Sequence, residues 1–166
     1  DEVRGCIDEL RSAGIPCNAN PALGVMVELP ATVEIAGDLA READFLSIGT
    51  NDLIMYILGA DRTNHRVADI YRSPHPAVLR ALKRIHDAAA AEGNSPSVCG
   101  ASAADPTMIY FYLGVGIRDL SVDPGKLGAV ATFLSSVDSA TAHRDAMRMI
   151  STSSRNELAT LLEEIG

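Results

Sequence analysis

The chain has 166 residues, of which 47% are hydrophobic and 22% charged, and its formal net charge is −8. This hydrophobic share excludes a disordered chain and supplies a sizeable core, whereas the negative charge argues against nucleic acid as a partner, because phosphate binding needs a basic surface. No apolar run approaches the roughly 18 residues of a membrane helix, so membrane insertion is not expected.

The cysteines Cys6, Cys17 and Cys99 show no paired spacing, and the chain starts without the basic and apolar segments of a signal peptide. This usage predicts reduced thiols and a cytoplasmic protein. The four histidines are scattered, and none forms the H-x-x-x-H spacing of a zinc site. Zinc chemistry is therefore not predicted.

The first half of the chain alternates apolar runs of strand length with segments of helical spacing. The predicted elements are, in chain order, a helix over 1–13, a strand over 24–29, a helix over 31–42, a strand over 45–48, a short helix through Leu53, Ile54 and Ile57, and a polar loop over 61–66.

Pro76 opens the clearest helix of the chain, because proline is well tolerated in the first helical turn. The later elements are, in order, a helix over 77–92, a strand over 97–99, a turn over 100–104, a helix capped by Asp105, a strand over 119–122, and helices from about 126 with breaks near 136 and 151. This alternation with short connections predicts an α/β fold, in which parallel strands are joined by right-handed crossovers.

Four strands are half of an eight-stranded β/α barrel, and 166 residues are well short of the roughly 250 of a complete one. We therefore expect residues 1–166 to form one half barrel. Such a sheet has two open edges, and open edges invite association. A homodimer is accordingly expected. The alternative is an open and marginally stable sheet that the extra C-terminal helices cover.

Glu28 and Asp52 stand at or just past the ends of consecutive predicted strands. Neighbouring parallel strands lie about 4.8 Å apart, so two such carboxylates can bind one hard cation. Mg²⁺ suits this arrangement, because it takes one or two carboxylates and leaves its other positions to water or substrate oxygens. The alternatives are a salt bridge at the barrel end for Glu28 and a helix N-cap for Asp52.

Asn51 and Arg62 are candidate phosphate ligands. An asparagine at a strand-to-helix turn can donate its amide to a phosphate beside the backbone N–H groups of the helix start. The planar guanidinium of arginine offers paired donors to phosphate or carboxylate. The alternative is that Arg62 is a surface charge paired with Asp61.

Cys99 ends the third predicted strand and precedes a glycine, a position that points its thiol into the mouth of a barrel. A thiol with an ordinary pKa near 8.5 is mostly protonated at neutral pH and can serve as a general acid. The alternative is a small buried hydrophobic residue, the usual state of a free cysteine.

Together these residues match one family in order and spacing. The motifs are 24–31 (GVMVELPA), 44–53 (DFLSIGTNDL), 60–64 (ADRTN), 75–79 (HPAVL) and 98–100 (VCG), followed by Ala103 and Asp105. With them the chain resembles the phosphoenolpyruvate-binding barrel of Enzyme I of the sugar phosphotransferase system, also called phosphoenolpyruvate–protein phosphotransferase. The resemblance implies a partial TIM-type (β/α)8 barrel, comprising strands five to eight with their helices.

The resemblance also implies a reaction, in which the phosphoryl group of phosphoenolpyruvate moves to a histidine of a phosphocarrier domain or protein and pyruvate is released. It assigns Glu28 and Asp52 to Mg²⁺, Asn51 and Arg62 to the substrate phosphate, and Cys99 to protonation of the enolate carbon.

The family usually has a glutamate directly after Cys-Gly, where this chain has Ala101, and a second glycine where it has Ala104. Two further arginines and the phosphorylated histidine of the family are supplied by other parts of the protein, so the isolated chain is predicted to be inactive. The alternatives are a catalytically silent half barrel that serves dimerisation or regulation, and a fragment of a dikinase-type enzyme.

Overall fold

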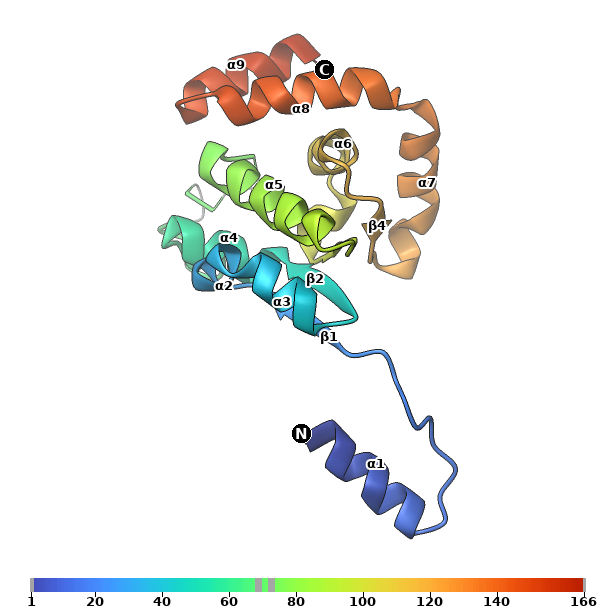
Figure 1. Ribbon diagram of the computed structural model, residues 1–166. Coiled ribbons are helices and arrows are strands. Elements are labelled where there is room, and N and C mark those ends of the chain that lie inside the picture. Colours follow the sequence, from blue (N-terminus) through green and yellow to red (C-terminus); the bar gives the residue numbers. More distant parts are fainter. Residues whose placement is uncertain (1, 68–69, 72–73, 166) are drawn as a thin grey trace.

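The computed structural model describes residues 2–67, 70–71 and 74–165. Strands alternate with helices along most of the chain, and helices alone form its last part (Figure 1). The elements are α1 (Glu2–Ser12), β1 (Gly24–Val27), α2 (Pro30–Glu34), α3 (Ala36–Glu42), β2 (Phe45–Gly49), α4 (Thr50–Leu58), α5 (Pro76–Ala91), β3 (Ser97–Cys99), the 3₁₀ helix η1 (Ala101–Ala104), α6 (Pro106–Val115), β4 (Asp119–Leu120), the 3₁₀ helix η2 (Pro124–Lys126), α7 (Leu127–Ser136), α8 (Ser139–Ser151) and α9 (Arg155–Ile165).

The four strands form one sheet in the order β1-β2-β3-β4, and every neighbouring pair is parallel. This confirms the predicted α/β class and the predicted strand direction. In the register, Val27 pairs with Ile48, and Ile48 pairs in turn with Val98. The carboxyl ends of β1, β2 and β3 therefore meet at one edge of the sheet.

Three predicted elements differ clearly from the observed ones. The strand expected over 24–29 ends at Val27, so Glu28 lies just after it. The helix expected over 31–42 is divided into α2 and α3, because the backbone of Ile35 (φ −113°, ψ 19°) leaves the helical region. The strand expected over 119–122 ends at Leu120. Its last hydrogen bond to β3 runs from the N–H of Ser121 to the carbonyl of Val98 (2.8 Å), and Asp123 then accepts from Gly125 N and starts η2.

The core lies between one face of the sheet and the helices. Alternate strand residues point into it, and Leu46, Ile48 and Val98 are fully buried. Helices α5 and α6 cover this face, and α8 packs on both of them from the other side, so that two helical layers stand over the sheet (Figure 1).

The opposite face of the sheet is open in the described part of the chain. Met26 and Phe45 lie on it with 49% and 43% of their surface exposed. All-parallel sheets normally have both faces covered, whereas no described element covers this face.

Helix α1 lies apart from the sheet at the end of an extended segment (Figure 1). None of its residues is buried, and the apolar residues Val3 and Leu10 remain 41% and 37% exposed. Within the described ranges, no helix is long and apolar enough to cross a membrane.

Candidate active site

The predicted site residues Glu28, Asn51, Asp52 and Cys99 all lie at the edge where the strands end. Glu28 directly follows β1, Cys99 is the last residue of β3, and α4 begins with Thr50 directly after β2. Because β2 lies between β1 and β3, its end separates Glu28 from Cys99. The parallel alternation thus collects carboxylate, amide and thiol groups from three strand ends.

The side chain of Glu28 lies across the end of β2. A Cβ atom added to Gly49 would stand 2.9 Å from both Cβ and Oε2 of Glu28, and 3.0 Å from Sδ of Met26. Only glycine leaves room for the carboxylate at this position. Among the described residues, no cation lies within ion-pair distance of Glu28, so the alternative of a salt bridge is not observed there.

Asp52 is the third residue of α4, and the N-cap of this helix is Gly49. The alternative interpretation of Asp52 as an N-cap is therefore wrong. Its carboxylate stands in the first helical turn, where the helix dipole favours negative charge. Glu28 and Asp52 are the two acidic residues at the ends of β1 and β2, and such a pair is a donor set that Mg²⁺ accepts.

The loop after α4 folds back over the start of that helix. Tyr71 OH donates to the backbone carbonyl of Asn51 (3.2 Å). Burial raises the pKa of the Tyr71 phenol, while the nearby charge of Arg62 lowers it and that of Asp52 raises it. The charges of Arg62 and Asp52 therefore both act on the phenol of Tyr71.

Asp61 binds Thr63 instead of Arg62. Its Oδ1 accepts from the backbone N–H and from the hydroxyl of Thr63, at 2.8 Å each. The pKa of Asp61 is lowered mainly by the backbone hydrogen bond from Thr63, and the charge of Arg62 has the smallest effect on it. Since Arg62 makes no ion pair with a described acidic residue, the alternative of a pair with Asp61 is not observed.

Cys99 lies on the open face of the sheet. Its neighbour Val98 points into the core, so the thiol points the opposite way. Sγ accepts from the hydroxyl of Ser47 (3.8 Å) and donates to the carbonyl of Ile48 (3.5 Å). The thiol is only partly buried, which differs from the alternative of a residue sealed in the core.

The turn after Cys99 is held by the first turn of α4. Gly100 has a φ of +97°, and a Cβ atom there would stand 2.6 Å from Thr50 Oγ1. The backbone N–H of Ala101 donates to Oδ1 of Asn51 (3.0 Å), which leaves the amide NH₂ of Asn51 as its donor group for a ligand. Thr50 and Ser102 were not predicted to belong to the site, although hydroxyl residues beside a glycine turn were an available signal.

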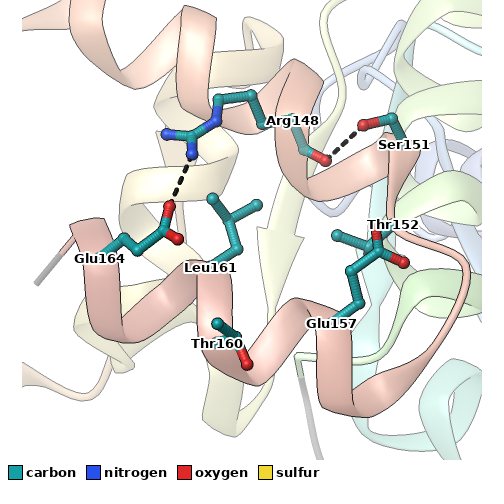
Figure 2. A pocket seen from close by; sticks show the side chains of 7 residues that line it. All are labelled: Arg148, Ser151, Thr152, Glu157, Thr160, Leu161 and Glu164. Carbon is teal, nitrogen blue, oxygen red and sulfur yellow. Dashed lines mark hydrogen bonds and ion pairs between the residues drawn. The ribbon is translucent and has the colours of Figure 1, made fainter.

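A separate hollow lies between α8 and α9, in the helical layer farther from the sheet (Figures 1 and 2). Arg148 there is already paired with Glu164 (2.8 Å) and Asp145 (3.3 Å), and Ser151 donates to the carbonyl of Arg148. Only the pair of Arg148 and Glu164 joins α8 to α9, because the other two contacts lie within α8. The residues that line the hollow all come from 148–164, so it is separate from the strand ends. Within the described residues, no group of three or more His, Cys, Asp or Glu side chains forms a further metal cluster.

A parallel α/β sheet with acidic, amide and thiol groups at its strand ends is typical of an enzyme. The family described as "PEP-utilising enzyme, PEP-binding domain" matches residues 2–139 of this chain. The chain therefore belongs to the family of phosphoenolpyruvate-utilising enzymes, which confirms the resemblance drawn from the motifs.

Individual relatives agree with this family. The Escherichia coli protein named "Phosphoenolpyruvate-dependent phosphotransferase system" is 38% identical over 96% of this chain. The "Phosphoenolpyruvate-protein phosphotransferase" of Listeria monocytogenes is 34% identical over 94% of it, and that of Staphylococcus carnosus is 35% identical over 93%. The chain spans 22% of the Escherichia coli protein and 27% of the other two.

Proposed function

We propose that this chain is the phosphoenolpyruvate-binding part of a phosphoenolpyruvate–protein phosphotransferase. The proposed reaction moves the phosphoryl group of phosphoenolpyruvate to a histidine of a phosphocarrier domain or protein, and it releases pyruvate. The observation that carries the proposal is the family match together with the convergence of Glu28, Asn51, Asp52 and Cys99 at one sheet edge. The free cysteines agree with a cytoplasmic location.

Each residue has a role that its chemistry permits. The amide NH₂ of Asn51 and the guanidinium of Arg62 bind the phosphate and stabilise its negative charge during transfer. Departure of the phosphoryl group leaves enolpyruvate, and Cys99 gives its proton to the terminal carbon to form pyruvate. Glu28 and Asp52 would hold Mg²⁺, which when bound supplies positive charge next to the phosphate.

The proposed magnesium site can be tested in the complete protein that contains this domain. Asp52→Asn keeps the shape of the side chain and removes one of the two proposed carboxylate ligands. We expect Mg²⁺ affinity to fall by about 10–100-fold, the range seen when even an outer-shell partner is lost. The measurement is a Mg²⁺ titration of pyruvate release.

Asp38→Asn is the matched control for this titration. Asp38 is an exposed carboxylate on α3, paired with Arg41 at 3.0 Å, and its neutralisation changes the net charge by the same amount. We expect this variant to titrate like the unmodified protein. Equal Mg²⁺ affinity of the Asp52 and Asp38 variants would contradict the proposed site.

We also propose that the sheet represents strands five to eight of a TIM-type barrel. Its support is the all-parallel order, the helical cover on one face and the exposed Met26 and Phe45 on the other. A barrel leaves no edge strands, so β1 and β4 would pair with further strands. In a longer protein the remaining domain would supply them, and in the isolated chain a second copy would.

The isolated chain is expected to form homodimers without activity. Association would cover the open face and pair the edges of β1 and β4, while the phosphorylated histidine remains absent. Sedimentation of the purified chain measures this directly. Phe45→Lys, which adds a charge to the open face, should shift the population towards monomer, and a monomeric unmodified chain would contradict the proposal.

A further inference from the structure

Three buried hydroxyl groups form a row behind the turn that carries Cys99. Tyr112 of α6 lies 2.7 Å from Ser102 of η1, Ser102 lies 2.7 Å from Thr50 of α4, and Thr50 lies 2.7 Å from the backbone carbonyl oxygen of Cys99. Tyr112 and Thr50 have no exposed surface, and Ser102 has 3%. The row thus runs from the core to the site.

The direction of these hydrogen bonds follows from the number of hydroxyl protons that the three side chains can donate. Thr50 donates to the Cys99 carbonyl, and Ser102 donates to Thr50. Each hydroxyl has a single proton, so Tyr112 must be the donor to Ser102. All three bonds point the same way, and in a buried row each one polarises and strengthens the next. Burial also raises the pKa of Tyr112, which keeps its proton in place.

The row ends on the peptide group between Cys99 and Gly100. On the other side of Gly100, the N–H of Ala101 is bound by Asn51. Two consecutive residues of α4 therefore hold both flanks of the glycine, one by its preceding carbonyl and one by its following N–H. This fixes the backbone of Cys99, and with it the direction of the Cα–Cβ bond, relative to Asn51.

We propose that Ser102 and Tyr112 are positioning residues of this site. Through Thr50 they hold the thiol of Cys99 at a set place relative to the amide of Asn51, so that the proton donor and the phosphate ligand face the same substrate together. The inference rests on the proposed function for the role of Cys99. Placement matters because a misplacement of about 1 Å at a reacting group can cost roughly 10²-fold in rate.

The test compares two tyrosines of one helix. Tyr112→Phe removes the first donor of the row and keeps the ring, whereas Tyr110→Phe removes a hydrogen bond to Asp145 (2.8 Å) on the far side of α6. In the complete protein, we expect Tyr112→Phe to lower kcat for pyruvate release by roughly 2- to 12-fold, the change that one hydrogen bond corresponds to. The KM for phosphoenolpyruvate and the kinetics of the Tyr110→Phe variant should stay unchanged.

A second readout follows Cys99 without turnover. Cys6→Ser and Cys17→Ser leave Cys99 as the only thiol of the chain, and its alkylation by iodoacetamide is measured against pH. Tyr112→Phe should change the dependence of Cys99 alkylation on pH, and Tyr110→Phe should leave it unchanged. In a Ser102→Ala background the effect of Tyr112→Phe should disappear, because the row is already interrupted.

The two readouts separate the two hypotheses. Alkylation profiles that are equal for the Tyr112 and Tyr110 variants would overturn the positioning role, whatever the kinetics. A changed profile together with unchanged pyruvate release would support the positioning of the thiol and would count against the role of Cys99 in the proposed function.

Discussion

Replacement of Cys99 by alanine in the complete protein should slow the formation of pyruvate by about 10²–10⁴-fold, the usual contribution of a positioned general acid. Phosphoryl transfer from phosphoenolpyruvate to the histidine should slow far less, because that step needs no proton at carbon. Rapid-quench measurement of both products in one experiment gives the two rates. The separation of the steps is the expected signature of a residue that acts after transfer.

The structure supplies the reason why this variant should keep its fold. The thiol lies on the open face and touches the Ser47 hydroxyl and the Ile48 carbonyl, so its removal leaves no cavity in the core. Cys17→Ala is a suitable control, because Cys17 lies in the segment between α1 and β1, away from the strand ends. Equal loss of both steps in Cys99→Ala would instead indicate damaged packing.

A complete protein that makes no pyruvate even with Cys99 in place would favour the catalytically silent half barrel. Ala101 is the residue that motivates this alternative, because the family usually has a glutamate there. In this chain the N–H of Ala101 is bound by Asn51, so the turn keeps a defined attachment to α4 without the carboxylate.

The location of the site could be predicted from the sequence because it depends only on chain order. Strands that alternate with helices are parallel, and parallel strands bring Glu28, Asp52 and Cys99 to one edge whatever the detailed packing is. The observed register, with Gly49 opposite Cys99, agrees with that expectation. The family could be recognised from the sequence because three of its motifs, 24–31, 44–53 and 98–100, include these strand ends.

The start of α4 could not be predicted correctly, because its polar side chains have partners far away in the sequence. Thr50 and Asn51 would suit a helix cap, but Thr50 donates to the Cys99 carbonyl and Asn51 accepts from Ala101. The two bonds join residues that are 49 and 50 positions apart, a separation that a local capping pattern does not contain. Such tertiary hydrogen bonds override local preference and also explain why the hydroxyl row was missed.

Replacement of Gly114 by alanine should lower the free energy of unfolding by about 1–3 kcal/mol, the range of an overpacked core. Gly114 lies where α6 crosses α8, and a Cβ atom there would stand 2.3 Å from the carbonyl oxygen of Ala142 and 2.6 Å from Cβ of Ala146. The first contact is with backbone, so no rotation of a side chain can relieve it. The two helices must move apart, and α8 also packs on α5.

The same substitution at Gly128 should have the opposite sign. Gly128 lies in α7, and a Cβ atom there would meet no heavy atom within 4 Å. Alanine is favoured over glycine by about 0.5–1 kcal/mol in the middle of a helix, and this is the upper limit for Gly128, the second residue of α7. Urea unfolding of the two variants, with equal slopes and midpoints displaced in opposite directions, measures both effects. A midpoint of Gly114→Ala that is not lowered would show that the close approach of α6 and α8 does not limit the size of residue 114.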